Sequence, residues 1–473
     1  MSQALDGMAP QELEVLRSAV RGRVVGPGDP DYDHVRTIWN GAVERRPAAF
    51  ARCTGVADVI AALRFARERG LRISVRGGGH NVAGSALCDG GLVIDLQPMK
   101  GMRLDLDAHR LVAQPGLRLG DVDHETQPFG LAVAAGINSE TGLAGLTVGG
   151  GIGWLMRKHG LTIDHLVAAD IVTADGRLLR ADAERHPDLY WAIRGGGGNF
   201  GIVTAFEFDL VEIGPSVLGG VIFYPAELAR EVLRRYRDWA AAAAEEVTTI
   251  LLLRLAPPLP WVPQEVRGRP VLGIGALYAG IPDDGVAILA PLAEFGPVLA
   301  NSIQQRPFVQ HQSMLDASAP AGRLYYWKSH YLSALTDAAI DVIADNAWSF
   351  RSTMSFTLLS HLGGAIRRRT DDETAFAGRD AEFAININCA ATRAEDFEHD
   401  RAWVRAWFDA LAPHSTGGVY VNFVGSEGDE RVHAAYGEKN YRRLAEIKAT
   451  HDPDNIFRVN QNITPTVVPA RAR

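Results

Sequence analysis

Three dense glycine clusters within residues 76–201 constrain the fold of this 473-residue chain more than any other feature. Glycine permits positive φ and lets backbone N–H groups approach an anion closely. The clusters are Arg76-Gly77-Gly78-Gly79-His80-Asn81, Gly149-Gly150-Gly151-Ile152-Gly153 and Gly195-Gly196-Gly197-Gly198-Asn199-Phe200-Gly201. A lone cluster is more often a simple turn, but three in one span predict loops that surround a ligand of dinucleotide size.

The third cluster has glycines at the spacing of a Rossmann fingerprint, at Gly196, Gly198 and Gly201. A helix-like segment, PDLYWAIR, precedes it, and a strand-like segment, GIVTAFEFDLVEI, follows it. The fingerprint needs the order strand, loop, helix, because the pyrophosphate binds at the N-terminus of the helix. We therefore exclude a nicotinamide Rossmann site at this cluster.

Hydrophobic periodicity predicts mixed α and β structure along the chain. Residues 56–70 are typical of a helix, residues 72–77 and 91–96 of short strands, and residues 166–181 of a hairpin that turns at Asp175 and Gly176. The character changes near residue 215, where we place a domain boundary. Beyond it we expect a helix around 226–245, several strands between 270 and 362, a strand at 417–425 and a helix at 444–457.

Composition and charge exclude several classes of partner. The net charge is −8, which provides no basic field for nucleic acid or for anionic lipid. Cys53, Cys88 and Cys389 are too few and too scattered for a disulfide framework or a zinc site, so we expect them to be buried and we predict no metal. No apolar run reaches the ~20 residues of a spanning helix, and the N-terminus is acidic and helix-like, so we expect a cytoplasmic protein that does not bind membranes.

Four segments, read in order, resemble the berberine-bridge-enzyme-like branch of the vanillyl-alcohol-oxidase superfamily. They are VRGGGHNVAGSALCDGGLVIDL, GLAGLTVGGGIGWLMRKHGLTIDHL, DLYWAIRGGGGNFGIVTAFEF and the C-terminal YVNF…DPDNIFRVNQNI. The resemblance implies an α+β fold with a two-part FAD-binding domain of the PCMH type. Residues 1–215 would begin this domain and residues 416–473 would complete it. Residues 216–415 would form an inserted substrate domain, an antiparallel sheet covered by helices.

The same resemblance implies which residues hold FAD. The pyrophosphate loop corresponds to Arg76, Gly77, Gly78, Gly79, Asn81, Gly84 and Ser85. The second flavin loop corresponds to Gly142, Gly145, Gly149, Gly150, Gly151 and Gly153, next to Asn138 and Thr141. Val203 falls on the strand beside the adenosine, and the amides of Asn460 and Asn462 are expected to bond the flavin edge or to cap the last helix.

His80 matches the histidine that binds the flavin 8α-methyl group covalently. A neutral imidazole nitrogen is nucleophilic near pH 7, which suits this chemistry. The alternative is a histidine that only caps the glycine loop or touches phosphate. Many members have a second link through a cysteine, but this chain has Asn138 there, so we predict a single link. Thr141 occupies the position that controls O2 access in the family, and its valine-like shape favours oxygen reactivity.

Tyr420 matches the catalytic tyrosine of several family members, and Asn422 lies on the same face if this segment is a strand. A tyrosine that merely fills a position in the sheet is the alternative. Two upstream strands present polar faces, Ser355, Thr357 and His361 on one and Asn386 and Asn388 on the other. Each face lines either the site or solvent. Neither strand carries Asp or Glu, so Tyr420 or His361 is the expected base or hydrogen-bonding group.

The resemblance thus implies a FAD-linked oxidase. Hydride would pass from a small hydroxyl, phenol or amine substrate to FAD, and electrons would then pass to O2, in bacterial secondary metabolism. A flavin-dependent monooxygenase or dehydrogenase would use the same FAD motifs, and a binding protein without activity could keep the fold. We expect a monomer or a homodimer.

Overall fold

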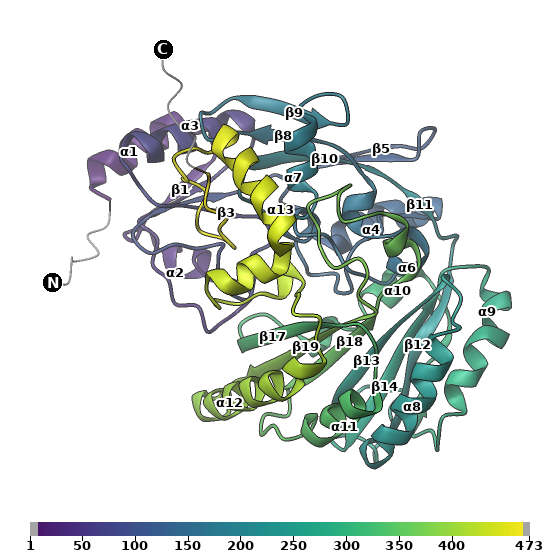
Figure 1. Cartoon of the computed structure of the whole chain (residues 1–473). Helices are drawn as coiled ribbons and strands as arrows, with labels where there is room; N and C mark the ends of the chain where they lie inside the picture. The colour runs from purple at the N-terminus through teal and green to yellow at the C-terminus, as the bar shows by residue number, and fades with distance from the viewer. Residues whose placement is uncertain (1–7, 467–473) are drawn as a thin grey trace.

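A computed structural model gives the structure of residues 8–466. The strands before residue 213 form three small sheets, and those from residue 217 onward form one eight-stranded sheet. Figure 1 shows the three small sheets in the upper part of the view and the large sheet in the lower part. The predicted α+β class and antiparallel sheet are confirmed.

The first small sheet has the order β1-β2-β4-β3 and is parallel except for β1. The second is antiparallel with the order β5-β6-β10-β8-β9, and β7 pairs with β11 in the third. Their bounds are β1 Arg23–Val25, β2 Ala49–Arg52, β3 Ile73–Arg76, β4 Leu92–Asp95, β5 Met102–Asp105, β6 Arg110–Ala113, β7 Leu131–Ala132, β8 Leu166–Val172, β9 Leu178–Asp182, β10 Ile202–Asp209 and β11 Val211–Glu212. The predicted hairpin at 166–181 is confirmed as β8 and β9.

Helices cover these small sheets. Those of the N-terminal half are α1 Pro10–Ala19, α2 Tyr32–Val35, α3 Val56–Glu68, α4 Leu119–Thr126, α5 Leu143–Val148, α6 Met156–His159 and α7 Pro187–Ile193. Helix α3 shows why hydrophobic periodicity predicted a helix here. Val59, Leu63 and Ala66 recur at helical spacing and are fully buried against the first sheet, while charged residues occupy the outer face.

The large sheet is antiparallel with the order β15-β12-β14-β13-β18-β19-β17, and β16 pairs with β12. Its strands are β12 Val217–Pro225, β13 Val247–Leu255, β14 Pro270–Tyr278, β15 Ala300–Asn301, β16 Gln304–Arg306, β17 Leu324–Leu332, β18 Phe356–His361 and β19 Phe383–Ala391. The later helices are α8 Ala229–Ala240, α9 Pro282–Leu289, α10 Phe308–Gln312, α11 Asp337–Asn346, α12 Ala394–Leu411 and α13 Asp429–His451. Helices α8, α11 and α12 bury one face of this sheet, and the other face is turned toward the N-terminal half.

The chain returns to the N-terminal half at its C-terminal end. Helix α13 lies beside the small sheets, in yellow in Figure 1, and packs into the same apolar cluster as β8 and β10. Cys53, Cys88 and Cys389 are buried free thiols, as expected. Within the described residues, no helix has both the length and the apolar character needed to cross a membrane.

Candidate active site

A cavity of about 360 Å³ lies between the glycine loops and the uncovered face of the large sheet. The glycine loops and the C-terminal segment form one wall, and strands β13, β17, β18 and β19 form the other. Most of the lining is apolar, with a few polar groups at fixed positions, as is typical of a site for an organic ligand. The first and third glycine clusters of the sequence, with Ile152 of the second, therefore meet around one space.

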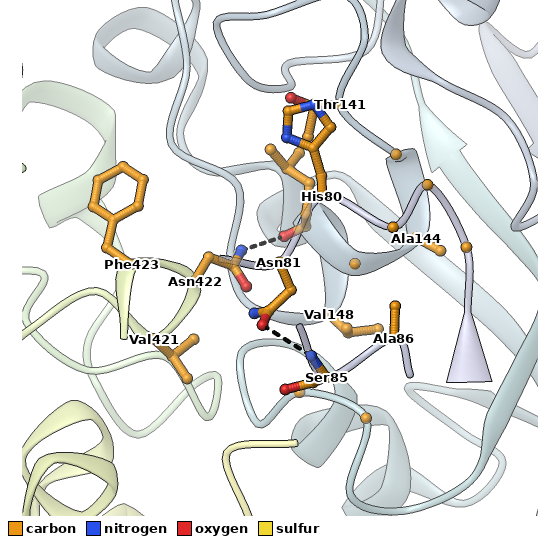
Figure 2. A pocket seen from close by; sticks show the side chains of 18 of the residues that line it. His80, Asn81, Ser85, Ala86, Thr141, Ala144, Val148, Val421, Asn422 and Phe423 are labelled. Carbon is orange, nitrogen blue, oxygen red and sulfur yellow. Dashed lines mark hydrogen bonds between the residues drawn. The ribbon is translucent and has the colours of Figure 1, made fainter. Parts of the chain in front are cut away.

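The first glycine loop lines this cavity through Gly77, Gly78, Gly79, His80, Asn81 and Ser85, of which Figure 2 labels three. A Cβ atom on Gly78 would lie 2.4 Å from the Cα of Gly142, so the two glycine loops touch backbone to backbone. The Asn81 side chain accepts a hydrogen bond from the Ser85 amide at 3.4 Å and closes the loop on itself. The loop therefore leaves its backbone, and little side chain, facing the cavity.

Two residues predicted for this loop lie elsewhere. The guanidinium of Arg76 points into the protein and pairs with Asp95, at 2.7 Å and 3.1 Å, so it joins β3 to β4 rather than lining the cavity. Gly84 adopts a φ of +73° beside Val43, and its carbonyl accepts a bond from Arg45. Both residues shape the loop from behind. This corrects the expectation that they face the ligand.

His80 projects into the cavity from the first loop. Its ring stacks on Trp39, with centroids 4.7 Å apart, and Trp39 stacks in turn on Tyr325. Burial, aided by the charge of Arg118, lowers the pKa of His80 to about 4, so the ring is neutral at pH 7. Its Nε2 is buried without a hydrogen-bond partner in the part of the chain that the structure describes. The cavity therefore presents a neutral, unpaired imidazole nitrogen.

The second loop separates into two groups of residues. Asn138, Thr141, Gly142 and Gly145 line the cavity as predicted. Gly149, Gly150, Gly151 and Gly153 do not, and instead make room for other parts of the site. A Cβ atom on Gly149 would lie 2.2 Å from the Asn422 side chain, and one on Gly150 would lie 3.2 Å from the Tyr420 ring. Gly149 and Gly150 thus leave room for the two C-terminal residues, and Gly153 leaves room for the backbone of Ala135, which corrects the assignment of these glycines as direct cavity residues.

Tyr420 is almost fully buried at the cavity wall, and its hydroxyl accepts two hydrogen bonds. The donors are the Gly151 amide at 2.9 Å and the Asn422 side chain at 2.7 Å. Asn422 also donates to the Leu146 carbonyl at 3.1 Å, the bond drawn in Figure 2. Burial raises the pKa of Tyr420, while these N–H donors act in the opposite direction. Tyr420 is therefore a neutral phenol whose oxygen is already held by two donors.

The segment that carries Tyr420 is not the predicted strand. Val421–Phe423 form a single 3-10 turn, closed by the Phe423 amide on the Tyr420 carbonyl at 2.9 Å. The chain meets the free edge of β17 between Ser415 and Gly418, where the Thr416 amide and the Gly418 carbonyl bond Tyr331, and then turns away before a ladder forms. Tyr420 and Asn422 still come together, because a tight turn also brings residues two apart close to each other.

Strand β18 presents to the cavity the face opposite to the one singled out by its polar residues. On β18 the cavity is lined by Phe356, Leu358 and Ser360, so Ser355, Thr357 and His361 are turned away from it. His361 is buried between Glu382, at 3.0 Å, and Arg157, at 3.1 Å, where burial lowers its pKa. The structure therefore corrects the placement of His361 as a catalytic candidate.

On the neighbouring strand β19, Asn386 and Asn388 line the cavity, which resolves their placement in favour of the site. Their Oδ1 atoms are buried and have no donor among residues 8–466. Each amide therefore has an oxygen that a ligand could bond.

The side-chain amides of Asn460 and Asn462 also lie in different places. Asn460 lines the cavity beside Val203, and its amide nitrogen bonds the Gly198 carbonyl at 3.0 Å. Asn462 does not line it and accepts a bond from the buried ammonium of Lys448 at 3.0 Å. Asn460 therefore faces the cavity, whereas Asn462 fixes the chain end instead, which corrects the expectation that it faces the ligand.

Sequence reasoning missed two polar residues of the sheet wall, Arg254 and Trp327. Arg254 stands in the apolar run LLLRLAPP, and a charge within such a run was itself a usable signal, because burying it is costly. Among the described residues that line the cavity, Arg254 is the only one with a charged side chain at pH 7, and none is Asp or Glu.

These features fit a bound FAD. Two glycine loops in backbone contact leave N–H groups free to bind phosphate, and His80 offers an unpaired nitrogen of the kind that a flavin link requires. The cavity lining also includes Val203 and, from the third glycine cluster, Gly197, Gly198 and Gly201. A ligand of dinucleotide size would contact both the first and the third cluster.

Comparison with known proteins agrees with this geometry. Residues 47–182 match the family described as an FAD binding domain, and residues 419–464 match the family described as berberine and berberine like. The two matches contain the first two glycine loops and the Tyr420 segment, respectively.

The relatives match nearly the whole chain. A FAD-linked oxidoreductase of Dictyostelium discoideum is 31% identical, with 97% of this chain and 98% of the relative covered. The (R)-6-hydroxynicotine oxidase of Paenarthrobacter nicotinovorans is 30% identical over 94% of this chain and 97% of its own. The crystal structure of 6-hydroxy-D-nicotine oxidase from Arthrobacter nicotinovorans superposes with a TM-score of 0.84 at 28% identity, covering 98% of this chain and all of that one. The chain therefore belongs to the berberine-bridge-enzyme-like family of FAD-linked oxidoreductases, and it is an enzyme.

Proposed function

We propose that this enzyme is an oxidase that holds FAD through a single covalent link at His80 and oxidises a small hydroxyl, phenol or amine compound with O2 as electron acceptor. FAD, when bound, accepts hydride from the substrate and delivers electrons to O2. The observation that carries the proposal is the shared cavity, in which His80 and Tyr420 both line a space bounded by the first and third glycine clusters and by Gly142 and Gly145.

We assign the holding of FAD to backbone and amide groups. Gly77, Gly78, Gly79, Asn81 and Ser85 would bind the pyrophosphate, and Gly142, Gly145, Val203 and Asn460 would contact the rest of the cofactor. Residues 1–215 and 416–473 would form this flavin unit, and residues 216–415 the substrate domain. Two facts support the division. The small sheets end at Glu212, and the large sheet begins at Val217. Residues 467–473 lie outside the described residues.

Tyr420 would hydrogen-bond the reacting oxygen or nitrogen of the substrate. Two N–H donors already point at its oxygen, while its own hydroxyl hydrogen has no acceptor in residues 8–466. The hydrogen is therefore free to face a substrate. The same donors stabilise negative charge on the oxygen, so Tyr420 can assist proton removal without a neighbouring carboxylate.

The choice of O2 as acceptor can be tested without knowing the substrate. Photoreduced enzyme is mixed with air-saturated buffer in a stopped-flow instrument, and the return of the flavin absorbance and the H2O2 formed are measured. We expect rapid reoxidation with one H2O2 per flavin, because Thr141 lines the cavity and is small. Slow reoxidation would identify a dehydrogenase and contradict the proposal.

Two substitutions at Thr141 sharpen this test. Thr141→Leu adds bulk at the proposed entry of O2 and should slow reoxidation, whereas Thr141→Val keeps the shape and should not. Equal rates in the two variants would show that Thr141 does not control O2 access.

A further inference from the structure

Arg254 occupies a defined place on the sheet wall of the cavity, at the end of β13. Because Leu253 pairs with Thr357, Arg254 stands beside Phe356 on the next strand. Phe356 pairs with Asn388, and Asn388 pairs with Trp327. Arg254, Phe356, Asn388 and Trp327 thus form one row across four strands, and all four line the cavity.

The guanidinium of Arg254 is fixed in direction but only partly satisfied. Its Nε donates to the Leu255 carbonyl at 3.0 Å, and Nη1 donates to the Ser318 hydroxyl at 2.5 Å. A guanidinium has five N–H groups, about three of which remain after these two bonds. They belong to Nη1 and Nη2, the pair that binds a planar carboxylate with two parallel bonds.

No negative partner balances this charge. Among residues 8–466, no Asp or Glu lies within ion-pair distance of Arg254, and none lines the cavity. Burial lowers the pKa of Arg254 to about 10, which still leaves the guanidinium charged at pH 7. A charge held in a largely apolar cavity without a counter-ion is costly, and an anionic ligand would offset that cost.

We propose that Arg254, with Ser318, binds a carboxylate group of the substrate, so that the enzyme oxidises carboxylate-bearing molecules. The inference rests on the proposed oxidase function and narrows its substrate class. Ser318 accepts the Arg254 bond and keeps its own hydroxyl hydrogen, which can also be donated to the anion.

The remainder of the row indicates the rest of the substrate. Phe356 and Leu358 present apolar surface, and beyond them Trp327 Nε1 and Asn388 Oδ1 are buried without partners in the described chain. Asn388 lies two strands from Arg254, which corresponds to roughly 10 Å at the usual strand spacing. The row fits a compact apolar body with the carboxylate at one end and a hydrogen-bonding group at the other.

The test uses the flavin-loaded enzyme and calorimetric titration with benzoate, phenylacetate and 4-hydroxybenzoate, each compared with its neutral amide. We expect the carboxylates to bind more tightly than the amides. Arg254→Met should weaken carboxylate binding by about 10- to 100-fold, the usual worth of a hydrogen bond to a charged group, and leave amide binding unchanged. Arg254→Lys should retain part of the preference. Arg269→Met, at an exposed arginine near the end of the adjoining strand β14, is the matched control and should change nothing.

Three results would overturn the proposal: no carboxylate binds, acids and amides bind equally, or Arg254→Met leaves carboxylate binding intact. An Arg254→Met variant with unchanged carboxylate binding and a shifted flavin spectrum would show that the charge of Arg254 acts on the cofactor and not on the substrate. Failure of the oxidase proposal would instead appear as slow reoxidation by O2 in the wild type, which is independent of carboxylate binding.

Discussion

At the scale of single residues, reactivity in this site comes from what surrounds a side chain. His80 is neutral because it is buried against Trp39, and the Tyr420 oxygen is fixed in place because Gly151 and Asn422 donate hydrogen bonds to it. Neither effect can be read from residue type. The sequence identified both residues only because their flanking motifs resemble those of a family.

Tyr420→Phe should slow anaerobic flavin reduction by the wild-type substrate about 10²- to 10⁴-fold, the usual contribution of a positioned proton-transfer group. The flavin spectrum and the reoxidation rate should change little. Tyr331→Phe is a suitable control, since Tyr331 is buried nearby, does not line the cavity, and its hydroxyl has no partner in the described residues. Stopped-flow reduction at the wild-type rate in Tyr420→Phe would assign the proton transfer to another group.

Attachment of FAD to His80 in the apoprotein should be independent of pH from 8 down to about 5. Burial lowers the pKa of His80 from 6.5 to about 4, so the nucleophilic neutral ring persists until the pH approaches 4. Because the unfolded chain binds this proton at higher pH, the same group should reduce stability as the pH falls from 6.5 toward 4. Attachment is followed as acid-stable flavin fluorescence on a denaturing gel. A rate that falls with a midpoint near 6.5 would show that His80 is not buried as described.

At the scale of elements, periodicity predicted the helices and strands well but not which face of a strand meets the site. Helix α3 and strands β3, β4, β8 and β9 lie where the pattern placed them. On β18 both faces are buried, so alternation alone could not distinguish them, and the apolar face proved to line the cavity. The Tyr420 segment was misread as a strand because its pattern says nothing about whether a partner edge is available.

Gly149, in the turn after α5, should affect catalysis only through Asn422. Gly149→Ala introduces no backbone strain, because its φ is −95°, but the new Cβ would lie 2.2 Å from Asn422 Oδ1 and displace that side chain. We expect losses of up to about 100-fold in flavin reduction for Gly149→Ala and for Asn422→Ala. The double variant should be no slower than the slower single one. Multiplying effects in the double variant would mean that Gly149 acts by another route.

At the scale of the whole molecule, the C-terminal part of the chain packs against the N-terminal half on the glycine-loop side of the cavity. The ammonium of Lys448 on α13 is fully buried and bonds Asn199 of the third glycine cluster, the Phe457 carbonyl and Asn462, with Asp452 at 3.6 Å. Burial lowers the pKa of Lys448 to about 8. This network joins segments about 250 residues apart in sequence, and local sequence patterns could not have revealed it.

Lys448→Met should destabilise the protein by about 3–5 kcal/mol, because it leaves Asp452 and two amide oxygens buried without their cation. The free energy is measured by urea unfolding of the flavin-loaded enzyme. Lys439→Met on the same helix removes an exposed ion pair with Asp372 and should cost less than about 1 kcal/mol. Equal losses in the two variants would contradict the proposed role of the network.

Peptide mass mapping of the purified protein tests directly whether FAD is linked to the protein through His80 alone. After proteolysis, we expect a single flavin-bearing peptide that contains His80, and an unmodified peptide around Asn138. Protein from His80→Ala should give no flavin-bearing peptide. A wild-type digest without any adduct, or with the adduct on a peptide that lacks His80, would contradict the proposed covalent link at His80.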